Sequence, residues 1–201
     1  MVTDIRAPWA DEDEALEPIV AAAIARGADP GLVKYLAIDA SMGRHVSRHN
    51  AEILGESMLA YPTYAEFLLV HGQAFVPPAV PRPKGIRKGT DKQCFANANH
   101  VAANHLWTYV EGYGTSYIPC HHAWVVDDDG TVIETTWRAP GVSYLGVPFP
   151  QDIVELSMLV TGYYGVMGPH MLMEPYTEES YRARLQAAWE NGERWRPVLS
   201  F

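Results

Sequence analysis

The chain has 201 residues, of which 48% are hydrophobic and 19% charged, a composition typical of one folded globular domain rather than of a disordered chain. Its formal net charge of −9 argues against nucleic acid or an anionic membrane as the main partner, because both need a net basic face. The longest nearly apolar stretch, residues 18–25, is far shorter than the roughly 18 to 20 residues of a membrane span. Acidic residues 11–14 stand where a secretory leader would be basic or apolar, so we expect a cytoplasmic domain.

Residues 11–75 have a helical pattern, with apolar residues at helical spacing over 16–24. Gly27 is well placed to end this first helix. Thr63 and Glu66 have the spacing of a capping box, which predicts a helix start. Four helices are expected within residues 11–75: over 16–26, from about 31, over 50–59 and from 63 to about 72. We expect this region to be architectural.

Residues 76–90 form a connection that is rich in proline and basic side chains. Proline donates no backbone hydrogen bond and restricts the residue before it, so this segment is predicted to be extended. Five basic residues lie just before Cys94, namely Arg82, Lys84, Arg87, Lys88 and Lys92. This local positive charge suggests a substrate with an acidic or phosphate-bearing group.

Residues 91–147 predict a helix followed by antiparallel strands, and 148–201 predict further helices. The expected elements are a helix over 91–106, strands over 109–117, 121–127, 131–137 and 142–147, and helices over 152–161 and 177–190. The turn residues 127–130 predict a hairpin in which Asp127 opposes Thr131. The whole chain, 1–201, is therefore predicted to be a single α+β domain, and its tail 194–201 is expected to pack back on the body.

Cys94 is the candidate nucleophile. The chain has only two cysteines, Cys94 and Cys120, too few for a disulfide framework. Thr90 and Gln93 have capping-box spacing, which puts Cys94 in the first turn of its helix. The helix N-terminus and the nearby basic residues would favour the thiolate form. The alternative is that Cys94 is a small buried apolar residue.

The adjacent residues His121 and His122 supply candidate bases for this nucleophile. With a three-residue hairpin loop, His122 opposes Thr136 and shares a sheet face with Glu134, whereas His121 shares its face with Ile133 and gains no carboxylate. A two-residue turn would reverse this assignment. On the first register, Cys94, His122 and Glu134 have the composition of a catalytic triad.

Two segments resemble a known family. Residues 93–98, Gln-Cys-Phe-Ala-Asn-Ala, are similar to the stretch around the catalytic cysteine of transglutaminases and papain-type proteases. His122-Ala123-Trp124 followed by Glu134-Thr135-Thr136 resembles the His-Ala-Trp and Asp-Pro-Thr pattern of transglutaminase-like proteins, with Glu in place of Asp. The resemblance covers residues 89–137, about a quarter of the chain. It implies a papain-like or transglutaminase-like α+β fold, with the cysteine helix packed on an antiparallel sheet and Cys94, His122 and Glu134 as catalytic residues.

Acyl chemistry also needs donors for the oxyanion, and the backbone N–H of Cys94 is the natural first one. Gln93, Asn97 and Trp124 are the candidate oxyanion or substrate contacts. Each residue also has an alternative interpretation: Gln93 as a helix cap, Asn97 as a solvent-exposed residue of the helix, and Trp124 as a core residue.

The expected function is cysteine-dependent acyl transfer on an amide or ester through a thioester, with no cofactor. The substrate would be a peptide, a protein or a small amide. Water as acceptor makes the protein a hydrolase or deamidase, and an amine makes it transglutaminase-like. Two alternatives remain: a non-enzymatic binding protein, and a zinc site drawn from Cys94, His100, Cys120, His121 and His122, whose spacing does not favour a metal.

Overall fold

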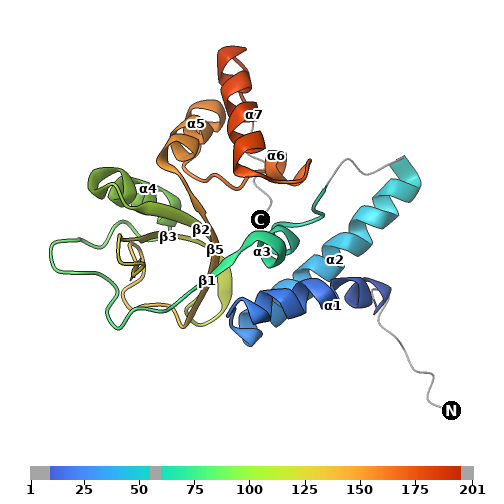
Figure 1. The fold of residues 1–201 in the computed structure, drawn as a ribbon, viewed down its shortest axis with the longest axis horizontal. Helices are drawn as coiled ribbons and strands as arrows, with labels where there is room; N and C mark the ends of the chain where they lie inside the picture. The colour runs from blue at the N-terminus through green and yellow to red at the C-terminus, as the bar shows by residue number, and fades with distance from the viewer. Residues whose placement is uncertain (1–9, 55–59, 196–201) are drawn as a thin grey trace.

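The computed structural model describes residues 10–54 and 60–195, and in these it is an α+β fold with seven helices and one antiparallel five-stranded sheet (Figure 1). The strands lie in the order β1-β5-β2-β3-β4. The helices are α1 (Ala10–Ala25), α2 (Pro30–Leu54), α3 (Tyr64–His71), α4 (Cys94–His105), α5 (Gln151–Thr161), α6 (Pro169–Leu172) and α7 (Glu178–Glu190). The strands are β1 (Gln73–Phe75), β2 (Thr108–Thr115), β3 (Pro119–Val126), β4 (Val132–Ile133) and β5 (Ser143–Phe149).

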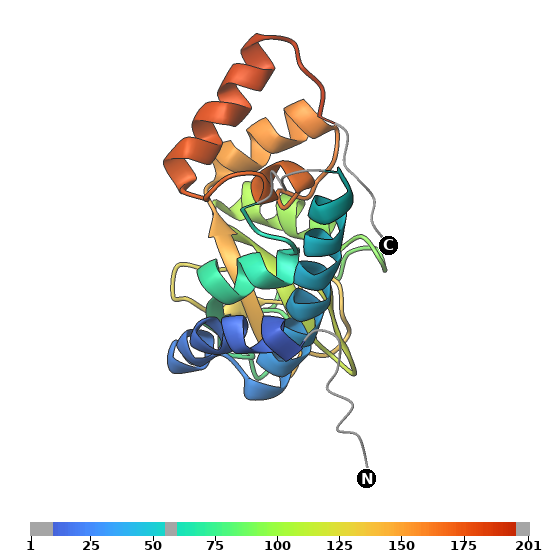
Figure 2. The same ribbon diagram turned by 90° about the vertical axis from the view of Figure 1, so that its right-hand side faces the viewer.

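Strand alternation divides the side chains of the sheet between two faces. Odd-numbered residues of β2, β3 and β5, such as Tyr109, Ala123 and Phe149, pack against the helices. Even-numbered residues such as Val110 and Trp124 form a smaller core on the other face. The helices α1 and α2 lie at one end of the molecule and α5 and α7 at the other, as Figures 1 and 2 show together.

The first helices differ from prediction in one respect. The helix before Gly27 is confirmed as α1, and Gly27 follows it with a φ of +90°. The predicted helices from 31 and over 50–59 are one continuous helix as far as Leu54, so their separation is wrong. No proline or turn-forming pair interrupts residues 44–54, which explains why α2 continues. Residues 55–59 lie outside the described residues.

Helix α3 begins as its capping residues predict. The Thr63 hydroxyl accepts a hydrogen bond from the N–H of Glu66 at 3.1 Å, and the helix ends before Gly72. The Glu66 carboxylate does not complete a capping box but binds the Arg44 guanidinium at 2.6 and 2.8 Å. This partly buried ion pair joins α3 to α2.

The hairpin register is confirmed. Asp127 N–H donates to Thr131 at 3.1 Å, and Val125 pairs with Ile133. The fourth strand is much shorter than predicted, because after Ile133 the chain binds the proline-rich connection instead of β3. Glu134 N–H donates to the Pro81 carbonyl at 2.7 Å, and Thr135 accepts from Gly89 at 2.8 Å.

The C-terminal helices are confirmed as α5 and α7, whereas the short elements β1 and α6 have no predicted counterpart. From the tail, the Trp195 side chain packs against the main core, and its backbone N–H donates to the Val160 carbonyl at 3.1 Å. Residues 196–201 lie outside the described residues. Within the described ranges, no helix combines the length and apolarity that crossing a bilayer requires.

Candidate functional site

Cys94 is the first residue of α4, but the helix start is not the predicted capping box. The preceding residue Gln93 makes no side-chain cap. Instead, the Asn97 side chain accepts from the N–H of Thr90 at 3.2 Å and donates to its carbonyl at 2.7 Å. Lys92 has a φ of +63°, so the loop turns sharply just before the helix begins.

Asn97 also donates to the Thr136 hydroxyl at 2.8 Å, which fixes the first turn of α4 beside the segment that follows β4. Its amide is thus occupied by protein groups on both sides. Asn97 therefore positions the helix that carries Cys94, and its role as a substrate contact stays a prediction.

The sulfur of Cys94 lies at an open edge of the sheet. Along β3, the backbone N–H and C=O groups of successive residues point alternately toward β2 and toward β4. Those of Val125 and Asp127 point toward β4. Ala123 would be next in this series, but β4 has already ended, so its N–H is free to interact with the Cys94 sulfur. The thiol therefore lies beside the residue that directly follows His122.

Burial raises the pKa of the Cys94 thiol to about 11, and the negative charge of Glu111 contributes, although the N–H groups of Ala123 and Phe95 act in the opposite direction. The expected thiolate is therefore not favoured in the resting protein. The basic residues before Cys94 are partly used elsewhere. Lys88 pairs with Asp91, and Arg82 donates to the carbonyl oxygens of Glu134 and Trp137. A base must remove the proton if Cys94 is to attack a carbonyl.

His122 and Glu134, predicted to share a sheet face, are joined in the structure. His122 is 2% exposed, and its Nε2 lies 2.9 Å from Oε2 of Glu134. The imidazole stacks on the Trp137 indole, with ring centroids 3.8 Å apart and planes inclined by 3°. Nδ1 makes no hydrogen bond to another described residue, so it is the nitrogen that remains for a thiol proton.

Glu134 is fully buried and accepts hydrogen bonds from four groups. Besides His122 these are the N–H groups of Thr136 and Trp137 at 2.8 and 2.9 Å and the Tyr144 hydroxyl at 3.1 Å. Burial raises the pKa of Glu134, but the hydrogen bond and charge of His122, together with the two N–H groups, bring it below its usual value. The carboxylate is therefore ionised and held in one orientation.

A second pair, His121 and Glu111, lies on the opposite face of β3. Nε2 of His121 is 3.1 Å from Oε1 of Glu111, without the direction of a hydrogen bond. The predicted hairpin with β4 offers His121 no carboxylate. Glu111 comes from β2, where it pairs with Ala123. An acid on the same face as Tyr109 and Tyr113 is the signal that could have identified it.

The two other predicted contacts differ in their surroundings. Trp124 is fully buried on the face opposite the helices, between Phe75 and Tyr144, so it belongs to the core and has no surface with which to touch a substrate. Gln93 is exposed and free of any capping role, and it stays a candidate oxyanion donor.

Neither cysteine forms a disulfide: Cys120 is exposed, and Cys94 is half-buried. Within residues 10–54 and 60–195, no three side chains of His, Cys, Asp or Glu gather as metal ligands would. The zinc alternative therefore has no support from this part of the chain.

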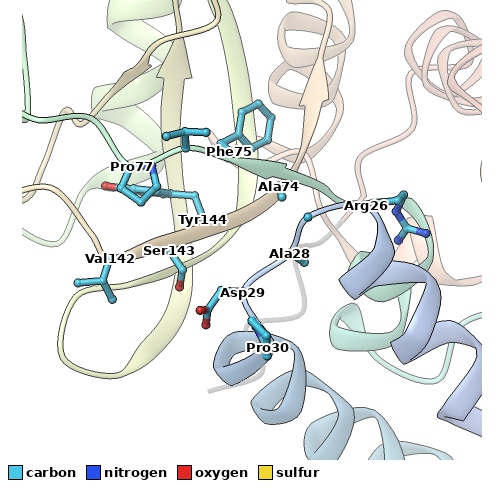
Figure 3. A pocket seen from close by; sticks show the side chains of 12 residues that line it. Arg26, Ala28, Asp29, Pro30, Ala74, Phe75, Pro77, Val142, Ser143 and Tyr144 are labelled. Atoms are coloured by element: carbon cyan, nitrogen blue, oxygen red, sulfur yellow. The ribbon is translucent and has the colours of Figure 1, made fainter.

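A cavity of about 440 Å³ lies at the α1–α2 turn and the β1–β5 edge, and Arg26, Asp29, Phe75 and Ser143 are among its lining residues (Figure 3). None of the predicted site residues lines it. Tyr144 is shared, since it lines this cavity and donates to Glu134.

Comparison of the chain with family models, curated proteins and solved structures gives no match.

Proposed function

We propose that this protein catalyses cysteine-dependent acyl transfer on an amide or ester, with Cys94 as nucleophile, His122 as base and Glu134 as the acid that orients it. The observation that carries the proposal is the buried 2.9 Å contact between His122 Nε2 and Glu134 Oε2, one residue from the N–H that interacts with the thiol. The packing of the Cys94 helix on an antiparallel sheet supports a transglutaminase-like arrangement of these parts, as the sequence resemblance implied.

In the first step, the Cys94 proton passes to Nδ1 of His122 while the sulfur attacks the carbonyl carbon. The backbone N–H of Cys94, free at the start of α4, stabilises the oxyanion, and the Gln93 side chain is the second candidate donor. His122 then gives its proton to the departing nitrogen or oxygen, and a thioester on Cys94 remains. Water releases the acyl group as an acid, and an amine would carry it away as an amide.

The raised pKa of Cys94 favours this general-base route. At pH 7, a thiol with a pKa of about 11 is ionised in roughly one molecule in ten thousand. Proton transfer to His122 as the sulfur attacks avoids the need for a preformed thiolate. Ionised Glu134 stabilises the imidazolium that results.

The test is the rate of Cys94 alkylation by iodoacetamide at pH 7, followed by intact mass spectrometry with Cys120→Ser in every variant. We expect His122→Gln to slow labelling about tenfold or more, because proton removal by a positioned base contributes at least this much. His100→Gln is the matched control, since His100 lies on the exposed side of the same helix and should leave the rate unchanged.

Equally slow labelling with and without His122 would identify Cys94 as a structural thiol and favour the non-enzymatic binding protein. Cys94→Ala completes the test. It should abolish hydrolysis of p-nitrophenyl acetate while the circular dichroism spectrum stays unchanged.

A further inference from the structure

The proposed mechanism leaves one histidine and one buried acid beside the nucleophile without a role. Glu111 is fully buried, and it accepts hydrogen bonds from the N–H groups of Val166 and Met167 at 2.6 and 3.2 Å and from the Tyr109 hydroxyl at 3.0 Å. These donors hold one carboxylate in place, 3.1 Å from the His121 ring. A buried acid with this many donors is costly to assemble unless its position matters.

The His121 ring is fixed by aromatic neighbours. It stacks with Tyr113 and Tyr64 at centroid distances of 5.7 and 6.1 Å, and the Phe95 ring meets it edge-on at 5.0 Å. Phe95 directly follows the nucleophile on α4. These contacts place His121 on the face of β3 that the Cys94 helix covers, and the charge of Glu111 acts on the Cys94 sulfur.

The two histidines differ sharply in their access to solvent. His122 is 2% exposed, and the Trp137 indole covers one face of its ring. The side chain of His121 is 32% exposed, and its buried nitrogen is the one that faces Glu111. The His121 side chain is therefore much the more accessible of the two to a water molecule, and the nitrogen of its ring that does not face Glu111 is Nδ1.

We propose that His121, positioned by Glu111, is the base that activates water for release of the acyl group, whereas His122 serves the attack by Cys94. This inference rests on the proposed function and adds a second base to it. The acceptor is then water, and the protein is a hydrolase.

Release of the acyl group begins with the attack of water on the thioester. One proton of water passes to Nδ1 of His121 while the water oxygen forms a bond to the thioester carbonyl carbon. The carbon–sulfur bond then breaks, and its electron pair stays on the Cys94 sulfur. The sulfur recovers a proton from the His121 imidazolium, and the acyl group leaves as a carboxylic acid.

The experiment separates the two steps with p-nitrophenyl acetate as the probe. Release of p-nitrophenolate reports acetylation, and intact mass spectrometry measures the acetyl group on Cys94. In His121→Gln we expect acetylation at the wild-type rate, followed by release slowed about 100-fold, the lower end of a general base's contribution. Acetyl-enzyme should then accumulate in this variant and not in the wild type.

Matched variants distinguish chemistry from packing. Tyr113→Phe keeps the ring that stacks on His121 and should leave both steps unchanged. Glu111→Gln keeps the size of the side chain and one acceptor oxygen, for the N–H of either Val166 or Met167, and as a positioning change it should slow release without slowing acetylation.

Three results would overturn the inference. Release at the wild-type rate from His121→Gln would remove His121 from the reaction. Loss of acetylation in the same variant, with its fold intact, would make His121 the base of the first step. Failure of wild-type Cys94 to become acetylated would instead overturn the proposed function, and this inference with it.

Discussion

At the scale of single residues, the site is organised by the hydrogen bonds of Glu134. Its Oε1 accepts from the N–H groups of Thr136 and Trp137, which leaves Oε2 for Nε2 of His122. An acceptor at Nε2 fixes the proton there and leaves Nδ1 unprotonated, as a base requires. The carboxylate thus determines both the orientation and the tautomer of the imidazole.

Glu134→Gln should therefore inactivate the protein more than its small change in size suggests. The amide oxygen can still accept from Thr136 and Trp137, but the amide NH₂ then faces Nε2 of His122 and favours the tautomer with the proton on Nδ1. We expect kcat/KM for ester hydrolysis to fall by about 100-fold to 10,000-fold, with an unchanged circular dichroism spectrum. Wild-type activity in this variant would show that Glu134 has a purely structural role.

At the scale of secondary-structure elements, the end of β4 at Ile133 creates the site. It opens the edge of β3 for the thiol and lets the following segment bind Asn97 of α4. The sequence predicted the hairpin register, because the turn residues 127–130 specify it locally. It could not predict where β4 ends, because the competing partners, Pro81 and Gly89, lie about 50 residues earlier in the chain.

Asn97→Ala tests this connection between elements. Three hydrogen bonds join the Asn97 side chain to Thr90 and Thr136, and their loss should lower the free energy of unfolding by about 1 to 3 kcal/mol. Alkylation of Cys94 should slow as well, because the first turn of α4 is no longer held. Urea titration measures the stability, and Asn104→Ala, at an exposed position on the same helix, is the control. A stability equal to that of the control would contradict the positioning role of Asn97.

The same distinction between local and distant partners explains which site residues the sequence could predict. Cys94, His122 and Glu134 follow from a helix start and one hairpin, both of which are local features. Glu111 lies on β2 opposite Ala123, so the β3–β4 hairpin alone does not include it, and its partners Val166 and Met167 follow it by more than 50 residues. The long helix α2 was predicted as two helices, although no proline or turn-forming pair interrupts residues 44–54.

At the scale of the whole molecule, buried histidines make stability depend on pH. Burial lowers the pKa of His170 to about 4, and the positive charge of Arg184 contributes. Burial also lowers the pKa of His71. Since an unfolded histidine titrates near 6.5, the unfolded chain binds protons between pH 6.5 and 4 that the folded chain does not. Stability should therefore fall as the pH falls through this range.

His170→Gln should reduce this acid sensitivity. One proton bound only by the unfolded chain changes the free energy of unfolding by at most about 1.4 kcal/mol per pH unit. Urea titrations at pH 7 and pH 5 should show a smaller loss in the variant than in the wild type. His100→Gln, a change at an exposed position, should leave the loss as it is. An equal loss in all three proteins would mean that His170 does not contribute to this dependence.

The adjacent histidines of β3 make the chemistry of the site depend on strand parity. A shift of β3 by one residue would exchange the surroundings of His121 and His122 and carry Trp124 to the helical face. In the observed register the Trp124 indole packs over Gly146, where a Cβ would come within 2.6 Å of it, and the Trp137 indole packs over Gly114, where a Cβ would come within 2.9 Å. An insertion or deletion of one residue in this strand would therefore be more damaging than most substitutions, because it would reassign both histidines at once.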